Sequence, residues 1–354
     1  MSYSVAEDSA LQATTGYRPR QGVADAAEIW SLPALDALAR AAAVVARSMP
    51  PTPQYSWPLL NARACVEVWV KHENHTPVGA FKIRGALVYM DWLIREHPEV
   101  RGVICATRGN FGQAVSYAAH RNGLSATIVV PCGNSPDQNR AIRAHGAELI
   151  EHGDDYQAAN EHAARLEVEH GYHRIPSFHE LLVHGTGTYA LEFLRGAPEM
   201  DTVYVPIGQG SSVCGMMAVR DALSLKTRIV GVVSSAAPAY ALSFEQRRLV
   251  ESSVTTVIAD GLACRKPVAK SLEFIFHGVE RIVAVTDEEV RGAMLALYED
   301  THQVAEGAGA ASLAALLQDQ SSGCLANIKR AGVVLTGSNV NRKIFADILR
   351  AQQQ

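Results

Sequence analysis

The sequence predicts an α/β fold with two interleaved open parallel sheets. Short, nearly continuous apolar segments alternate with longer amphipathic segments, a pattern typical of parallel strands joined by crossover helices. The strand-like segments also fall into two series along the chain, which indicates a smaller domain inserted in a larger one. We therefore expect an N-terminal arm (residues 1–30), a large domain (residues 31–89 and 187–354) and a small inserted domain (residues 90–186).

The elements of the first half follow from hydrophobic spacing. Ser31 is the expected cap of the first helix, with Pro33 in the first turn. Residues 66–72 alternate between polar and apolar side chains, as a strand with one polar face does. The remaining expected strands are residues 102–106, 126–130 and 147–150, and the expected helices are residues 32–45, 110–120, 137–145 and 156–169.

The second half repeats this alternation. Its apolar runs are short and rich in valine and isoleucine, which favours buried strands. The expected strands are residues 202–205, 228–233, 281–285 and 332–335, with helices beginning near residues 213 and 286 and a last helix at 341–350.

The composition excludes several classes of protein. The chain has 354 residues, 48% hydrophobic and 19% charged, which fits a well-buried enzyme and argues against disorder. The formal charge of −4 gives no basis for a nucleic-acid or membrane partner. The first 30 residues lack an apolar leader and no run reaches spanning length, so we expect a cytoplasmic protein. The six cysteines lack metal-ligand spacing.

Lys82 is the first candidate catalytic residue. It follows a small-residue turn and Phe81, and it precedes a segment with helical spacing. A partly shielded lysine amine can be held neutral and nucleophilic enough to bond covalently to an aldehyde cofactor. Taken alone, a lysine near a helix start is more often a solvated surface residue.

A glycine-rich turn follows the strand at residues 202–205. Its glycines allow backbone N–H groups to converge on an anion, and the start of the following helix adds partial positive charge. A phosphate group is the expected ligand, although an ordinary strand-to-helix turn explains the motif equally well. The candidate residues are Gly208, Gln209, Gly210, Ser211 and Ser212.

A third stretch, Thr107-Arg-Gly-Asn-Phe-Gly-Gln113, lies at the carboxyl end of a predicted strand. Ligands of open α/β sheets bind at such ends. Asn110 is a candidate partner of a cofactor hydroxyl, and Thr107, the backbone at Gly109 and Gln113 are candidates for a substrate carboxylate. A glycine-containing turn with an asparagine cap is the alternative explanation.

Thr336 ends the last predicted strand and completes the set. Together the four stretches predict a site for pyridoxal phosphate. A hydroxyl facing the pyridine nitrogen leaves the ring closer to neutral than a carboxylate does, which favours prompt loss of a β-leaving group. Glu306 either contacts the substrate β-hydroxyl or orders the ring, or it is simply an acid in a first helical turn.

These stretches resemble the fold-type II pyridoxal phosphate enzymes of the tryptophan synthase beta superfamily, most closely the threonine/serine dehydratase and serine racemase branch. The resemblance spans about residues 45–345 and includes supporting matches at residues 146–148, 184–188, 259–262 and 304–310. It implies that Lys82 bonds to the cofactor, Asn110 contacts its hydroxyl, residues 208–212 bind its phosphate and Thr336 faces its nitrogen. Phe81 belongs to the same cofactor-binding pattern.

The sequence also departs from that family. Arg108 stands where racemases of this branch place a serine, and an arginine is a poor proton shuttle but a good carboxylate partner. We therefore predict little racemase activity. Phe111 replaces a histidine, which leaves room for an apolar β-substituent or serves core packing. Residues 232–236 lack the acids with which some relatives bind a cation, so we expect no metal, and no regulatory domain is expected after residue 350.

The resulting hypothesis is a dehydratase that converts a β-hydroxy amino acid such as L-threonine or L-serine to a 2-oxo acid and ammonia. Lys82 would act as the general base. Two alternatives stay open: β-replacement, as in cysteine- or cystathionine-forming relatives, and a non-catalytic protein that carries the cofactor. The resemblance further implies a homodimer or homotetramer.

Overall fold

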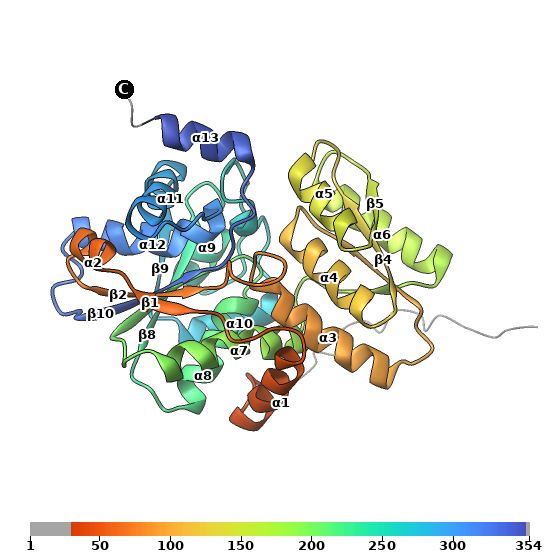
Figure 1. The fold of residues 1–354 in the computed structure, drawn as a ribbon, viewed down its shortest axis with the longest axis horizontal. Helices are drawn as coiled ribbons and strands as arrows, with labels where there is room; N and C mark the ends of the chain where they lie inside the picture. Colours follow the sequence, from red (N-terminus) through yellow and green to blue (C-terminus); the bar gives the residue numbers. More distant parts are fainter. Residues whose placement is uncertain (1–29, 352–354) are drawn as a thin grey trace, which may run out of the picture. The chain divides into compact units, whose positions relative to one another are not determined.

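The computed structural model describes residues 30–351. The predicted N-terminal arm, apart from its last residue, lies outside the described residues. Within them, strands and helices alternate along the chain and form two separate sheets (Figure 1).

Within residues 30–351, the larger sheet has six strands in the order β1-β2-β10-β7-β8-β9. All neighbours in it are parallel except β1, which pairs antiparallel with β2. Its strands are β1 (Gln54–Ser56), β2 (Glu67–His72), β7 (Thr202–Pro206), β8 (Arg228–Ser234), β9 (Arg281–Val285) and β10 (Arg330–Leu335).

The smaller sheet, counted over the same residues, has four parallel strands in the order β5-β4-β3-β6. Its strands all lie between β2 and β7 in the sequence, so the two sheets interleave and the predicted fold class is confirmed. The residue limits assigned to the two domains stay a prediction. The strands are β3 (Gly102–Ala106), β4 (Ser125–Val130), β5 (Glu148–Glu151) and β6 (His173–Arg174).

Helices connect the strands and cover the sheets (Figure 1). They are α1 (Leu35–Ala46), α2 (Pro58–Ala64), α3 (Lys82–Glu96), α4 (Asn110–Arg121), α5 (Pro136–Ala144), α6 (Tyr156–His170), α7 (Glu180–Gly196), α8 (Ser211–Ala222), α9 (Ala239–Gln246), the 3₁₀ turn η1 (Asp260–Leu262), α10 (Ala269–Gly278), α11 (Asp287–Thr301), α12 (Gly307–Ser321) and α13 (Arg342–Arg350).

The first helix and several later ones differ from the prediction. Ser31 does not cap α1, because the cap position is Ala34 and Pro33 precedes the helix. Helices α7 and α12 were not predicted as elements. Both are rich in small residues and are buried on most sides, so neither carries the polar face that marks an amphipathic helix.

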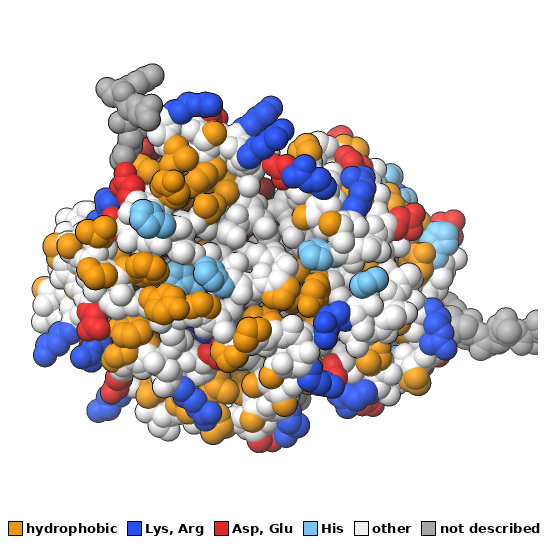
Figure 2. Space-filling model, in the orientation of Figure 1, with side chains coloured by type: hydrophobic (Ala, Val, Ile, Leu, Met, Phe, Trp, Pro, Cys, Tyr) orange, Lys and Arg blue, Asp and Glu red, His pale blue; other side chains and the backbone are white. Residues whose placement is uncertain are grey.

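Hydrophobic side chains also lie on the surface. Figure 2 shows them gathered over α2, β1 and α11. Tyr55 on β1 is 52% exposed and Leu59 on α2 is 62% exposed, and Tyr298 on α11 is also exposed. Among the described helices, none combines the length and the hydropathy needed to cross a membrane.

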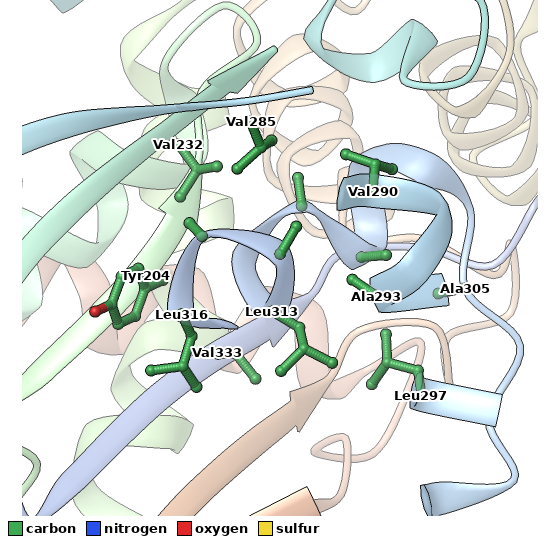
Figure 3. Close-up of a cluster of buried hydrophobic side chains, with 14 of the residues drawn as sticks. Tyr204, Val232, Val285, Val290, Ala293, Leu297, Ala305, Leu313, Leu316 and Val333 are labelled. Atoms are coloured by element: carbon green, nitrogen blue, oxygen red, sulfur yellow. The ribbon is translucent and has the colours of Figure 1, made fainter. Parts of the chain in front are cut away.

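The core of the larger sheet is organised around α12. Its Leu313 and Leu316 pack between sheet residues, such as Val333 of β10, and residues of α11, such as Leu297 (Figure 3). The helix is buried on nearly every side. Its first turn lies against the segment after β10, where the Glu306 backbone nitrogen donates to the Gly337 carbonyl.

Three helices approach one another at backbone distance. A Cβ atom on Gly185 of α7 would lie 2.3 Å from the carbonyl oxygen of Arg84 in α3. A Cβ atom on Gly215 of α8 would lie 2.7 Å from the backbone nitrogen of Gly187 in α7. Only glycine permits these approaches, so α3, α7 and α8 form one tightly packed group, which we call the glycine seam.

A buried ionic network joins the glycine seam to the large sheet. The Arg84 guanidinium donates to Glu73 Oε2, after β2, at 2.7 Å and to Glu192 Oε1, on α7, at 2.7 Å. Lys71 of β2 also donates to Glu192, at 2.6 Å. The side chains of Arg84 and Glu73 are fully buried, and Thr52 and Thr188 complete the network.

We predict that Arg84→Met lowers the free energy of unfolding by about 3–5 kcal/mol, because the Glu73 carboxylate would stay buried without a cationic partner. Urea unfolding measures this loss. Arg63→Met is the matched control. It removes a half-exposed ion pair with Glu299 and Asp300 and should cost about 0–1 kcal/mol. Equal losses in the two variants would contradict the prediction.

Candidate active site

The predicted site residues meet where strands of both sheets end. Thr107 follows β3, Gly208 follows β7 after one intervening residue, and Thr336 follows β10 directly. Thr107 and Gly208 line a cavity of about 380 Å³, which Lys82, at the start of α3, also lines. The cavity therefore lies at the carboxyl ends of parallel strands, where ligands of such sheets bind.

A smaller pocket of about 30 Å³ opens beside this cavity. It is lined by predicted cofactor residues from separate segments of the chain: Phe81, Lys82, Asn110, Gly208, Gln209, Gly210, Ser211, Ser212 and Thr336. All nine cofactor-binding candidates therefore border one pocket.

The glycine-rich turn has the geometry of an anion cradle. Gly210 has φ of +101° and immediately precedes α8, and a Cβ atom on Gly208 would lie 2.4 Å from the Gly261 carbonyl oxygen. The turn is fixed from outside, since the Tyr240 hydroxyl donates to the Gln209 carbonyl at 3.0 Å. Backbone N–H groups at a helix start bind phosphate well, so the residues present fit a phosphate group.

Lys82 is half-buried, and the pKa of its amine lies below the usual range because protein atoms replace water around it. The negative charge of Glu306 opposes this shift. A lysine with a lowered pKa keeps a larger share of neutral amine, which is the form that bonds to an aldehyde and that accepts a proton.

Glu306 is held by a chain of amides that crosses the site. Its Oε1 accepts from Asn110 Nδ2 at 2.6 Å, and Asn110 Oδ1 accepts from Asn339 Nδ2 at 2.8 Å. Asn339 Nδ2 also donates to the Val78 carbonyl at 2.8 Å. Burial raises the pKa of Glu306 to about 7, although the Asn110 hydrogen bond and the Lys82 charge oppose the rise. The group is therefore partly protonated near neutral pH.

The substrate-binding candidates are brought together only in part. Thr107, Arg108 and Gly109 line the cavity, and Thr107 Oγ1 accepts from the Gly109 backbone nitrogen at 3.0 Å. Gln113, in contrast to the expectation, is not among the lining residues. It is buried, and its Nε2 donates to Gln138 Oε1 at 2.5 Å, so Gln138 stands between Gln113 and the cavity.

Several lining residues were not predicted. Asp260 lies within a segment noted only as a supporting match, and burial raises its pKa while the Arg108 charge lowers it. Tyr156, Ser177 and Cys264 also line the cavity. No local motif marks these three, because loops from distant parts of the chain bring them there. Asn339 belongs to the stretch around Thr336, but its amide contact with Asn110 needs the folded structure.

Residues 30–351 contain no group of three or more histidine, cysteine, aspartate or glutamate side chains arranged to hold a metal ion. The absence of a metal site stays a prediction. His184, which lies on α7, does not line the cavity.

The fold, the half-buried Lys82 and the glycine-rich turn at the carboxyl ends of the strands are the features expected of a cofactor-dependent enzyme. The family described as pyridoxal-phosphate dependent enzyme matches residues 45–337, and this chain belongs to it. The family confirms the resemblance recognised in the sequence and the predicted cofactor.

Two curated relatives are named as enzymes that act on L-threonine. The chain is 34% identical over 285 residues to the L-threonine ammonia-lyase of Geobacter sulfurreducens, covering 80% of this chain and 70% of that protein. It is 30% identical over 293 residues to the biosynthetic L-threonine dehydratase of Escherichia coli, covering 82% of this chain and 56% of that protein.

Solved structures share the fold over almost the whole chain. Maize serine racemase superposes with a TM-score of 0.83 at 26% identity, covering 91% of this chain and 98% of that one. The processed form of threonine deaminase isoform 2 from Solanum lycopersicum superposes with a TM-score of 0.81 at 25% identity, covering 90% and 94%.

Glu306 should make the stability of the cofactor-free protein depend on pH. Its folded pKa of about 7 lies above its ordinary value of 4.5, so the folded protein binds more protons between these values. The stability that Glu306 contributes is therefore fully present below about pH 4.5 and is lost as pH rises through 7. Because Glu306→Gln stays neutral, this variant should gain stability relative to the unaltered protein over that interval.

Melting temperatures measured from pH 4.5 to 8 check this prediction. Glu245→Gln, at an exposed position on α9, serves as the control and should follow the unaltered protein. A Glu306→Gln curve parallel to that of the unaltered protein would contradict the raised pKa.

Proposed function

We propose that the protein is a pyridoxal phosphate-dependent dehydratase, or ammonia-lyase, that converts a β-hydroxy amino acid such as L-threonine or L-serine to a 2-oxo acid and ammonia. The observation that carries the proposal is that Lys82, the glycine-rich turn and Thr336 line one pocket. This pocket shares several lining residues, Lys82 among them, with the larger cavity. The names of the relatives support the reaction type.

The residues of the smaller pocket fit the cofactor along its length. The cradle at residues 208–212 would hold the phosphate, and Thr336 would face the ring nitrogen with a hydroxyl. Asn110, already fixed by Glu306 and Asn339, would contact the ring hydroxyl. When bound, the cofactor accepts the electron pair left at the α-carbon, so that the β-carbon–oxygen bond can break.

The remaining steps fall to side chains of this chain. The amine of Lys82, with its lowered pKa, removes the proton from the substrate α-carbon. Arg108 and the backbone of the Thr107–Gly109 turn orient the substrate carboxylate at the start of α4. Glu306, protonated in part near neutral pH, supplies a proton to the departing hydroxide.

Two rival reactions share the same site. A β-replacement enzyme would add a second nucleophile to the β-carbon after the hydroxyl group leaves. A non-catalytic protein that carries the cofactor would release no 2-oxo acid. Release of 2-oxo acid without an added thiol argues against both. Racemisation should be minor, because Arg108 stays charged and cannot shuttle a proton.

Lys82→Ala should abolish both elimination and covalent cofactor attachment. Borohydride reduction followed by intact mass measurement detects the attached cofactor in the unaltered protein, and the variant should show no added mass. Lys270→Ala is the control, since Lys270 lies on α10 outside the cavity in an ion pair with Glu273. An unchanged adduct in Lys82→Ala would refute the cofactor assignment.

Arg108→Ala should raise KM by about tenfold to a hundredfold, because a charge-assisted hydrogen bond to the substrate carboxylate is lost. The value of kcat should fall less, since the carboxylate does not react. Arg140→Ala, which removes an exposed arginine of α5 paired with Asp137, should leave both constants unchanged. A KM unaffected in Arg108→Ala would assign the carboxylate to the backbone turn alone.

We also propose a cytoplasmic homodimer or homotetramer. The exposed apolar side chains on β1, α2 and α11 supply a candidate contact surface (Figure 2). All six cysteines are free, as in a reducing compartment. Light scattering of Leu59→Asp against the unaltered protein tests the surface, and an unchanged mass would remove it as the contact.

A further inference from the structure

The charges in the larger cavity limit the substrates it can accept. Its charged lining side chains, within the described residues, are Lys82, Arg108, Asp260 and Glu306. On the proposed function, Lys82 serves the cofactor and Arg108 the substrate carboxylate. A second carboxylate on the β-carbon would therefore face Asp260 and Glu306 without a cation of its own, which is costly in a partly desolvated site.

A cationic β-substituent is disfavoured for a related reason. Asp260 interacts electrostatically with Arg108, and Glu306 accepts from Asn110 and interacts with Lys82. Both carboxyl groups are thus already engaged with partners. An uncharged β-substituent is the class that leaves these interactions intact.

Part of the cavity wall is apolar, although uncharged polar side chains line the cavity as well. Val257 and Ile258 precede η1, Val340 and Ile344 flank the start of α13, and Phe111 is the second residue of α4. Phe111 packs on the core cluster that includes α3 and α4, whereas Val340 and Ile344 pack on the cluster around α12. The apolar wall therefore draws on both sides of the site, where Figure 1 shows α4 and α13.

Val257 presents an exposed apolar side chain at the cavity wall. Its side chain is 69% exposed although it lines the cavity, whereas the adjacent Ile258 is 7% exposed. The hydrogen or methyl group on the β-carbon of serine or threonine covers little apolar surface. An aromatic ring offers a larger apolar surface to Phe111 and the aliphatic lining residues.

Resting on the proposed function, we infer that the preferred substrate is a β-hydroxy amino acid with an aromatic β-substituent, which binds against the wall formed by Phe111, Val257, Ile258, Val340 and Ile344. The discrimination comes from apolar contact on the β-substituent and from the lack of a free cation for an acidic one. The α-carboxylate and the β-hydroxyl keep the partners described above.

The test measures 2-oxo acid release by the cofactor-loaded enzyme from 3-phenylserine, threonine, serine and 3-hydroxyaspartate, each as separate stereoisomers. We expect kcat/KM for one phenylserine isomer to exceed that for threonine about tenfold or more, with hydroxyaspartate the poorest. Threonine or hydroxyaspartate equal to or better than phenylserine would overturn the inference and leave the dehydratase intact. No release from any member would overturn both.

A pair of variants tests the wall itself. Val257→Ser should lower the ratio of kcat/KM for phenylserine to that for serine by about fivefold, because apolar contact with the ring is lost. Val168→Ser is the matched control. Val168 of α6 is 75% exposed and lies outside the cavity, so both values should stay unchanged. An unaltered ratio in Val257→Ser would overturn the inference.

Discussion

The buried guanidinium of Arg84 fixes the position of Lys82, the proposed catalytic residue. It satisfies Glu73 and Glu192 together, and through them it ties α3 to β2 and α7. Successive residues of a helix are about 100° apart around its axis, so Lys82 points roughly opposite to Arg84. With Arg84 held against the sheet, Lys82 is directed to the cavity. A buried charge with all its partners present thus sets the rotation of the helix.

Hydrophobic spacing was enough to predict the two sheets and their interleaving. Parallel strands such as β3, β4 and β8 are nearly continuous apolar runs, and residues such as Asn110 and Thr286 mark the helices between them. Helices α7 and α12 were not predicted, because they are rich in small residues and are buried on most sides, so their few polar residues do not form a continuous polar face. Ser31 resembled a cap, but the cap position is Ala34, which has no capping side chain, so no residue type in the sequence marks the start of this helix.

Most of the proposed cofactor residues could be predicted because they lie in distinctive turns shortly after the ends of β3, β7 and β10. Gln113 and Gln138 are a case in which position after a strand did not predict which residue lines the cavity. Both amides are plausible ligands by type, and only the fold decides which one lines the cavity and which supports it. Tyr156 and Cys264 carry no motif and reach the site through tertiary structure alone. The family pattern at residues 184–188 does not line the cavity. Its glycines Gly185 and Gly187 instead allow α7 to pack closely against α3 and α8.

The glycine seam has a mechanical consequence. Lys82 begins α3 and the phosphate cradle begins α8, and both helices are locked to α7 at backbone distance. The two proposed anchors of the cofactor therefore belong to one closely packed group of helices. The turn at Thr107, proposed to bind the substrate, follows a strand of the smaller sheet. A movement of the smaller sheet against the larger one would change the distance from Thr107 to Lys82 but leave the spacing between Lys82 and the cradle unchanged, so substrate could exchange while the cofactor stays bound.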